Sequence, residues 1–485
     1  MRGRPLLPAL LAGAVISAGS GASAQTAAQS WKDVPRPPLR SFSIPRPTRI
    51  ALPNGMVVLL MEDRELPLVS GIAYIRAGSR YEPAALAGMG EVLSGSWRAG
   101  GTRRRTGDEL DDYLEARAAK VETQVGMTAA TVSLSCLKGD FDDVLAAFLE
   151  VLREPAFAED KIDVATNAVN TGIARRNDDP SDIVDREAMK VAYGADSPYA
   201  RVPEYATVAA VTREDLLAWH RRYVHPNRML FGLVGDFDSK AMEARLRKAF
   251  ASWPRGPDFT DPEPFIQKTP RSGVFLVDKD DVNQSNIRLI HLDTTRKDPD
   301  YFALQVVNQI LSGNSASRLY TNVRAKKGLA YFVFGGFYEE YDYPGVFEAG
   351  MGTKSETTAA GVEALLEEIQ KAADGPIAAD ELARAKDSIL NSFVFQFDSK
   401  EKVLRQQLAY EYYGYPADFL DRYRSAVEKV TAAEAQAAAR RHLHRDRLAI
   451  VVVGKSSDFG TGLASFGPVT RLDVAIPPPP AAASP

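Results

Sequence analysis

The sequence predicts an α+β protein built from two similar halves. Residues 208–235 and 427–454 align without a gap, so that His225 matches His444 and Gly235 matches Gly454. In each copy a Thr precedes a helix-like segment, and a short basic turn then leads into an apolar strand. A repeat at this long spacing indicates a duplicated domain rather than a solenoid.

The first half begins with strand-like segments. Residues 49–80 predict two strands joined by an Asn54-Gly55 turn, followed by a third strand. A helix-like segment at 81–96 and a helix at 107–119 come next, and strands are expected at 120–123 and 129–137. Residues 141–153 have the i, i+3, i+4 apolar spacing of an amphipathic helix. Further helices are expected at 160–176 and 181–191.

A Pro- and Asp-rich stretch separates the two copies of the repeat. We therefore expect an N-terminal domain at 47–253, a linker at 254–271 and a C-terminal domain at 272–470. Residues 471–485 are rich in proline, which predicts a disordered tail.

The N-terminus has the features of a targeting segment. Arg2 and Arg4 precede a mostly apolar run, and Ala22-Ser23-Ala24 offers a cleavage site before residue 25. The apolar run is too short for a permanent membrane span. We expect residues 1–24 to form a signal peptide and 25–46 an extended lead-in. The mature protein is then expected in a bacterial periplasm, without a membrane span.

Composition excludes several other classes of protein. The chain has 485 residues, 45% of them apolar and 25% charged, with a formal net charge of −4. The basic run Arg103-Arg104-Arg105 is short, so a nucleic-acid-binding surface is not indicated. Cys136 is the only cysteine, which excludes an internal disulfide and a cysteine metal cluster. Its strand-like surroundings predict a small buried side chain.

Residues 317–337 carry the pattern with the most chemical content. A helix is expected to end at Arg324 to Lys327 with Gly328 as its stop, and a strand to begin at Tyr331 and run to residue 334. A guanidinium and a phenol at this bend could both donate hydrogen bonds to a peptide carbonyl or an oxyanion. Alternatively, Arg324 offsets the helix dipole and Tyr331 is a packed strand residue.

The same stretch, SRLYTNVRAKKGLAYFVF, resembles the C-terminal signature of the pitrilysin/insulinase (M16) zinc peptidases. The resemblance covers about residues 48–454 and implies two two-layer α/β sandwich domains, each a sheet with helices packed on one face. It implies that Arg324 and Tyr331 contact a bound peptide. One departure is Ser312-Gly313-Asn314, where many relatives have a glycine run.

The resemblance also implies a zinc site in the first half, and there this sequence departs from the family. Relatives carry H-x-x-E-H on a helix, with two histidine ligands and a glutamate as general base. Here Gly88 and Val92 stand at the histidine positions, and only Glu91 remains, as a vestige of the general base. Gly172, next to Thr171, occupies the region of the downstream glutamate ligand. No zinc is therefore expected in this chain.

The five histidines offer no obvious replacement site. His220 and His225 are five residues apart, off a shared helical face. His442 and His444 flank the helix-to-strand turn of the second repeat, and His291 stands alone. We expect them to be helix-end and turn residues.

Three functions remain open. By resemblance, the chain is the non-catalytic, substrate-binding subunit of a heteromeric M16 metalloendopeptidase, whose partner subunit carries the intact motif and the zinc. The alternative is a peptide-binding or structural M16-like protein without proteolysis. The third, a self-sufficient zinc peptidase, lacks a visible ligand set.

Overall fold

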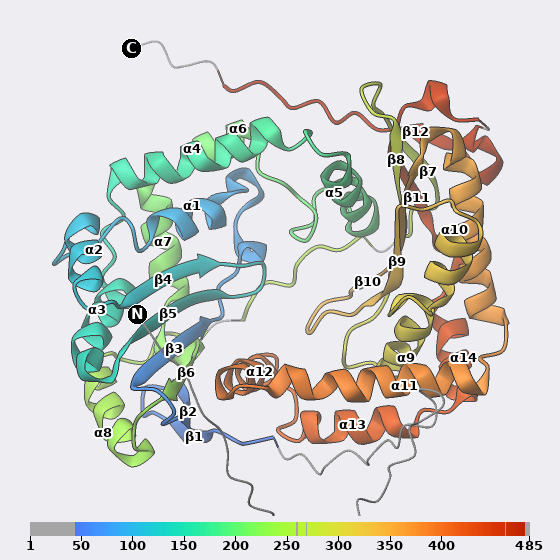
Figure 1. Ribbon diagram of the computed structural model, residues 1–485. Coiled ribbons are helices and arrows are strands. Elements are labelled where there is room, and N and C mark those ends of the chain that lie inside the picture. The colour runs from blue at the N-terminus through green and yellow to red at the C-terminus, as the bar shows by residue number, and fades with distance from the viewer. Residues whose placement is uncertain (1–43, 259, 268, 461, 481–485) are drawn as a thin grey trace, which may run out of the picture. The chain divides into compact units, whose positions relative to one another are not determined.

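Two six-stranded mixed sheets form the framework of the protein (Figure 1). The computed structural model describes residues 44–258, 260–267, 269–460 and 462–480. The first sheet has the order β1-β2-β6-β3-β5-β4, with strands β1 (Thr48–Ala51), β2 (Val57–Glu62), β3 (Leu68–Ile75), β4 (Lys120–Val125), β5 (Ala130–Leu137) and β6 (Met229–Gly235). The second has the order β12-β7-β11-β8-β10-β9, with strands β7 (Gly273–Asp278), β8 (Gln284–Leu292), β9 (Phe332–Tyr338), β10 (Val346–Lys354), β11 (Ala449–Gly454) and β12 (Val469–Arg471).

The two sheets share one topology over five strands, which confirms the α+β class with two similar halves. Strand β6 pairs parallel with β2 and antiparallel with β3, and β11 pairs in the same way with β7 and β8. The outermost strand breaks the correspondence. Strand β1 is antiparallel to β2, whereas β12 is parallel to β7 and comes from much later in the chain.

The repeated helix begins in the same way in both halves. Helix α7 (Arg213–Tyr223) starts with a complete capping box between Thr212 and Asp215. Helix α14 (Ala432–His442) starts with one between Thr431 and Glu434. In each box the hydroxyl accepts a backbone N–H of the first turn, and the carboxylate accepts the backbone N–H of the Thr. The repeat thus reflects shared structure, as predicted.

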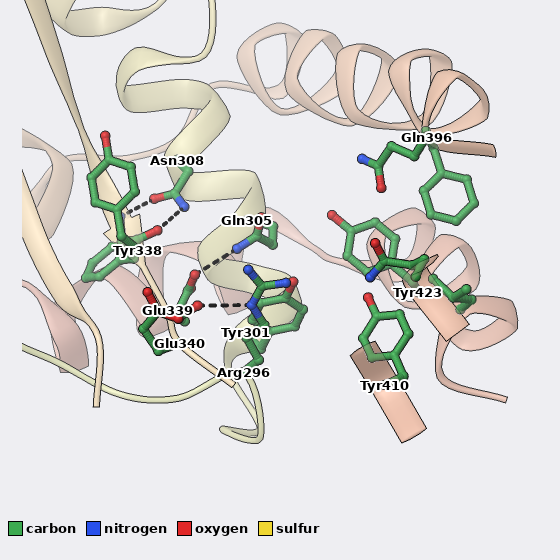
Figure 2. A pocket seen from close by; sticks show the side chains of 14 residues that line it. Arg296, Tyr301, Gln305, Asn308, Tyr338, Glu339, Glu340, Gln396, Tyr410 and Tyr423 are labelled. Atoms are coloured by element: carbon green, nitrogen blue, oxygen red, sulfur yellow. Dashed lines mark hydrogen bonds between the residues drawn. The ribbon is translucent and has the colours of Figure 1, made fainter. Parts of the chain in front are cut away.

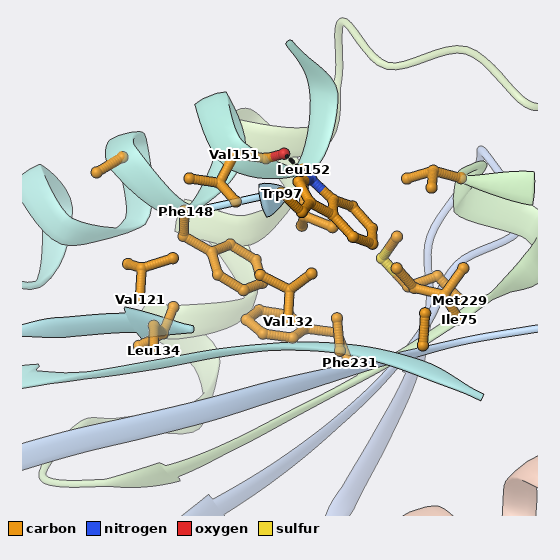
Figure 3. Close-up of a cluster of buried hydrophobic side chains, with 14 of the residues drawn as sticks. Ile75, Trp97, Val121, Val132, Leu134, Phe148, Val151, Leu152, Met229 and Phe231 are labelled. Atoms are coloured by element: carbon orange, nitrogen blue, oxygen red, sulfur yellow. Dashed lines mark hydrogen bonds between the residues drawn. The ribbon is translucent and has the colours of Figure 1, made fainter. Parts of the chain in front are cut away.

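One face of the first sheet carries helices of its own half. They are α1 (Met89–Ser96), α2 (Gly107–Glu115), α3 (Phe141–Arg153), α4 (Glu159–Arg175), α6 (Tyr205–Ala209), α7 and α8 (Ser239–Phe250). Trp97 is fully buried among them, and its indole N–H donates to the carbonyl of Val151 at 2.8 Å (Figure 3). Helix α3 has the predicted bounds. Cys136 is buried in this core, as predicted.

The second sheet is covered in the same manner on one face. Its core contains side chains of α9 (Tyr301–Ser312), α10 (Thr358–Asp374), α11 (Ala379–Phe393), α13 (Phe419–Lys429), α14 and a π-helix at Tyr320–Lys326. A short 3₁₀ helix, η8 (Val394–Phe397), leads from α11 into α12 (Lys400–Tyr412).

The other face of each sheet is covered by a helix from the opposite half. Helix α5 (Pro180–Tyr193) packs on β8 and β11, where its Val184 and Val191 meet Val451. Helix α12 packs on β6 and β2 of the first sheet, where Leu404 and Leu408 meet that sheet's second face. Residues from Ile44 onward therefore form one compact unit.

Polar contacts reinforce this exchange of helices. Arg288 on β8 is buried and pairs with Asp185 of α5 at 2.6 Å. At the end of α12, the Tyr412 hydroxyl donates to the carbonyl of Thr128 at 2.6 Å. Arg76 of the first half donates to the carbonyl of Tyr412 at 2.6 Å. Each crossing helix is thus fixed by packing and by hydrogen bonds.

Two predicted helices of the first half differ from the structure. The helix-like segment predicted at 81–96 is a helix only from Met89, because 3₁₀ turns at Ser79–Tyr81 and Ala84–Leu86 precede it. The helix predicted at 107–119 ends at Glu115, since Ala118 has a positive φ of 47°. In both cases the apolar spacing continues beyond the hydrogen-bonded helix.

The tail is more ordered than its composition predicts, and the linker makes a side-chain contact with the first half. The described residues of 254–271 contain no helix or strand, yet Arg228 binds Asp261 at 2.5 Å. In the predicted disordered tail, Arg471 belongs to β12, the N–H of Leu472 donates to Leu276, and Ile476 packs against the first core. The predicted signal peptide at 1–24 and residues 25–43 of the lead-in lie outside the described residues. Among the described helices, none is long and apolar enough to cross a membrane.

The contact between β6 and α12 yields a stability prediction. A Cβ on Gly232 would overlap the Leu408 side chain. We expect Gly232→Ala to lower the free energy of unfolding by about 1–3 kcal/mol through overpacking, and Leu408→Ala to lower it by about 2–5 kcal/mol through a cavity. Because the new methyl group occupies that cavity, the double variant should lose less than the sum of the two. Denaturant unfolding measures all three values.

The control is Leu66→Ala, which truncates an exposed leucine and should change stability by less than about 0.5 kcal/mol. Strict additivity in the double variant would contradict the described packing of α12 on β6.

Candidate functional site

Helix α1, which carries the positions of the expected metal motif, begins with a left-handed residue. Gly88 is its N-cap and has φ +100° and ψ −6°. An L side chain is strained in this conformation. A Cβ at Gly88 would lie 2.8 Å from Cβ of Pro203 and 3.0 Å from Cγ2 of Val208. The first motif position therefore lies outside the helix, in space that two side chains already fill.

A carboxylate from outside the helix binds the backbone N–H groups at the start of α1. Glu82 accepts the backbone N–H of Gly90 at 2.9 Å and that of Gly88 at 3.3 Å. Arg201 lies 3.9 Å from the same carboxylate and donates to the carbonyl of Glu82 at 2.5 Å. Burial raises the pKa of Glu82, and the two N–H groups and Arg201 act against that rise. Glu82 thus bonds the free N–H groups at the start of α1 from outside the helix, a role that sequence inspection missed.

The other motif positions lie in different environments, one in the core and the others at the surface. Val92 is fully buried in the first core, among side chains such as Val121 and Phe148. Glu91 is exposed on the first turn of α1, and partial desolvation raises its pKa. Gly172 lies on an exposed part of α4, where a Cβ would meet no atom within 4 Å. Positions 88, 91, 92 and 172 therefore form no common ligand set.

Arg324 lies in the last turn of the π-helix at Tyr320–Lys326. The π-helical hydrogen bonding was not predicted, and such turns are frequent at functional sites. Leu319 and Val323 are fully buried and anchor this segment in the second core. Arg324 is exposed, with its guanidinium carbon 5.0 Å from the centre of the Tyr320 ring. Anchored apolar residues thus present an accessible guanidinium.

Tyr331 follows the bend that closes this segment. Gly328 has φ +65°, as a helix-ending glycine requires. Tyr331 is 51% exposed, and its N–H donates to the carbonyl of Gly352 at 2.9 Å. The strand predicted at 331–334 runs in fact from Phe332 to Tyr338 and includes both glycines that follow Phe334. Within the described residues no hydrogen bond joins Arg324 to Tyr331, so their convergence on one ligand stays a prediction.

Strand β9, next to Tyr331, forms an edge of the second sheet. Asn308 of α9 accepts the N–H of Phe337 at 2.7 Å and donates to its carbonyl at 2.8 Å. Both backbone groups of Phe337 therefore face away from β10. Because this orientation alternates along an antiparallel strand, those of Val333 and Gly335 face outward as well. Val333 is half-buried, whereas Gly335 is buried, and Asn308 occupies the edge at Phe337. The accessible part of this edge is therefore at Val333, close to Tyr331.

Each half of the chain matches its own family model. Residues 57–200 match the family model "Insulinase (Peptidase family M16)", and residues 210–389 match "Peptidase M16 inactive domain". The chain belongs to peptidase family M16. An "uncharacterized zinc protease" of Mycobacterium bovis is 25% identical over 415 residues, which cover 84% of this chain and 93% of that relative. One from Streptomyces coelicolor is 23% identical over 422 residues, covering 84% and 90%.

Solved structures agree on the M16 fold. A peptidase M16 inactive domain from Pseudomonas fluorescens has a TM-score of 0.77 at 24% identity, covering 87% of this chain and 100% of that one. A protease from Helicobacter pylori has a TM-score of 0.74 at 19% identity, covering 85% and 100%. At these identities the likeness establishes the fold.

The described residues do not fit the zinc ion that M16 peptidases carry. A zinc site needs at least three donor side chains directed at one point. Position 88 has no side chain and no space for one, position 92 points into the core, and position 172 carries a glycine. The departure seen in the sequence is thus also a departure in backbone and packing.

The histidines are engaged elsewhere. His220 is buried and hydrogen-bonds the carbonyl of Leu152 at 2.8 Å, and burial lowers its pKa to about 4. His442 lies 2.9 Å from Asp293 and 3.2 Å from Asp300. Burial disfavours its charged form, but the carboxylates outweigh burial and raise its pKa.

His442, Asp298 and Asp300 have a spacing that could hold a metal ion. However, both imidazole nitrogens already face carboxylates, and Arg441 forms two hydrogen bonds with Asp300 at 2.6 and 2.7 Å. The cluster is therefore an ion-pair network at the end of α14, a larger role than the helix-end position that the sequence indicated.

Gly88 and Gly172 should respond in opposite ways to substitution by alanine. We expect Gly88→Ala to lower the free energy of unfolding by about 1–2 kcal/mol for the left-handed backbone alone. We expect Gly172→Ala to raise it by about 0.5–1 kcal/mol, because that helical site is open and alanine favours helix. Denaturant unfolding of both variants tests this. A neutral Gly88→Ala would refute the described geometry of the N-cap.

Restoring the motif residues should not restore the metal site. We expect the triple variant Gly88→His/Val92→His/Gly172→Glu to bind no stoichiometric zinc after dialysis, because positions 88 and 92 cannot direct imidazoles to one point. Metal analysis gives the zinc content, with Gly172→Glu alone as a folded control. One tightly bound zinc per chain would contradict the described fit.

Proposed function

We propose that this chain is the non-catalytic, substrate-binding subunit of a heteromeric M16 metalloendopeptidase. The observation that carries the proposal is the contrast between the two halves. The metal positions of the first half are closed by backbone and packing at Gly88 and Val92. The Arg324 and Tyr331 side chains of the second half remain exposed. A partner subunit with an intact H-x-x-E-H motif would carry the zinc and supply its Lewis-acid chemistry.

Arg324 and Tyr331 would act on the peptide by hydrogen bonding. A guanidinium and a phenol are both donors, and donors that are fixed in advance stabilise a carbonyl as negative charge develops on its oxygen. The π-helix supports this role for Arg324, since buried Leu319 and Val323 hold its backbone while the side chain stays exposed. The backbone hydrogen bond of Tyr331 supports the same role for the phenol.

The accessible part of the β9 edge would bind the peptide backbone. A peptide added beside the half-buried Val333 would pair with its outward N–H and C=O groups. Asn308 limits this pairing at Phe337. The peptide would therefore extend from Asn308 toward Tyr331, and its carbonyl groups would come within reach of the phenol.

The proposed location of the protein is the periplasm. A signal peptide at residues 1–24 would direct the chain to the periplasm, where the partner subunit and the peptide substrates would be found. The signal is inferred from the sequence pattern alone.

Hydrolysis by the reconstituted pair tests the proposal. We expect the mature chain alone to be inactive, and activity to appear on mixing with an M16 subunit that carries the intact motif. Arg324→Ala and Tyr331→Phe should each lower turnover of the pair by about tenfold or more, because each removes a donor to the developing charge. A fluorogenic peptide assay measures turnover.

Lys326→Ala is the matched control, because Lys326 is an exposed cation two residues from Arg324 and should leave turnover unchanged. If neither Arg324→Ala nor Tyr331→Phe changed turnover, the assigned roles would be wrong. Peptide binding without any hydrolysis on mixing would favour the alternative, a peptide-binding or structural protein.

A further inference from the structure

A cavity of about 470 Å³ lies in the second half, apart from Arg324 and Tyr331. Helix α9, the end of β9 and the residues after it form one wall, with Arg296, Gln305 and Glu339 (Figure 2). Residues of η8, α12 and α13 form the opposite wall, with Gln396, Tyr410 and Tyr423 (Figure 2). Carboxylate and amide groups thus face aromatic rings across an open space.

Glu339 is the unusual residue of this cavity. It is only 6% exposed, and its Oε2 accepts a hydrogen bond from Gln305 at 3.0 Å. The other oxygen, Oε1, is buried and has no hydrogen-bond partner among the described residues. A buried carboxylate oxygen without a donor is costly, and native structures rarely leave one unexplained. Oε1 itself exposes almost no surface, so a ligand in the cavity that donates a hydrogen bond would satisfy it after a rotation of the Glu339 carboxylate.

The nearby cation, Arg296, makes no hydrogen bond to the Glu339 carboxylate among the described contacts. Arg296 donates from Nε to the backbone carbonyl of Glu339 at 3.0 Å rather than to its carboxylate. The guanidinium carbon lies 4.0 Å from the centre of the Tyr341 ring, in a cation–π contact. Glu340 also lines the cavity, so its lining contains two carboxyl groups and one arginine. This balance favours a positively charged ligand over an anion.

The opposite wall suits the same kind of ligand. The rings of Tyr410 and Tyr423 line the cavity there, and Tyr301 of α9 lines it from the Glu339 side. Tyr423 stacks on Phe393 with 5.3 Å between ring centres. Such a packed ring has a fixed face, and aromatic faces attract cations. A group held between Glu339 and these rings would gain a charged hydrogen bond and a cation–π contact together.

We propose that this cavity binds a positively charged amine or guanidinium group through Glu339 and the tyrosine rings. The group is either a small free amine or the basic side chain of a peptide. This goes beyond the proposed function, because the site needs neither the partner subunit nor Arg324 and Tyr331.

Binding should depend on pH through Glu339. Burial and the nearby Asp293 raise the pKa of Glu339 to about 7, although its own backbone N–H, Arg296 and Gln305 oppose the rise. A cation prefers the ionised carboxylate, so affinity should rise as pH increases toward 7 and then level off, with proton release on binding below that pH. The other titratable groups that face the cavity are Glu340, Tyr301, Tyr338, Tyr410 and Tyr423.

Calorimetry on the mature chain tests the proposal with n-butylammonium, ethylguanidinium and neutral 1-butanol. We expect at least one cation to bind at least about tenfold more tightly than butanol. Glu339→Gln, which keeps an oxygen for Gln305, should lower that affinity by about tenfold or more and reduce its pH dependence to the part due to Glu340. Tyr423→Leu should weaken binding by roughly threefold or more. The control Glu214→Gln, at an exposed glutamate of the first half, should bind like the native chain.

A blocked Gly-Lys-Gly peptide, compared with its norleucine analogue, distinguishes the two sources. If the lysine peptide binds more tightly than n-butylammonium, the ligand of the cavity is the basic side chain of a peptide. If n-butylammonium binds more tightly, the ligand is a small free amine. Equal binding of cations and butanol would overturn the proposal, and so would an unchanged affinity in Glu339→Gln. If Glu339→Gln fails to fold, proton release by the native chain decides, since its absence at pH 6 also overturns the proposal.

Discussion

The structure depends on the need to bury both faces of each sheet. The central strands carry apolar residues at consecutive positions, such as Leu59 and Leu60 on β2, and these point to opposite faces. Helices of the same half cover one face only. The second face is covered by α12 for the first sheet and by α5 for the second. Neither half therefore completes its own core, and the two repeats are joined by more than the linker.

The two repeats differ in the functional residues that they carry. The first half lacks the metal positions: α1 starts after a left-handed Gly88, whose N–H and that of Gly90 are bonded to Glu82. The second half has an exposed Arg324 and Tyr331 beside the edge strand β9. Since both cores are fully packed, the loss of metal positions did not cost the fold. The first half has a packed core but no metal-ligand side chains at these positions.

Sequence reasoning predicted the repeated parts well, because they depend on local rules. The Thr212 and Thr431 caps and the bounds of α3 follow from capping and apolar spacing. The π-helix was missed because it has the same buried positions, Leu319 and Val323, as an α-helix would have. The partners of α5 and α12 could not be predicted, since an amphipathic pattern shows that a helix has an apolar face but not which sheet covers it.

The candidate site was predicted in part for similar reasons. The missing ligands at positions 88, 92 and 172 could be found from residue identity, but the positive φ of Gly88 and the cap by Glu82 depend on contacts with distant residues such as Pro203 and Arg201. Likewise Glu339 follows an aromatic strand and gives no sign in the sequence of being buried. Helices α9, α12 and α13, distant in the chain, create its surroundings.

The crossing of α12 also has a consequence for the order of folding. A chain made from its N-terminus has all strands of the first sheet once residue 235 has emerged. The helix that covers the second face of that sheet ends only at Tyr412. Until then Leu59, Met61 and Val234 have no cover, and exposed apolar surface of this kind favours aggregation. The nascent chain therefore passes through a long interval in which a chaperone has a defined surface to protect.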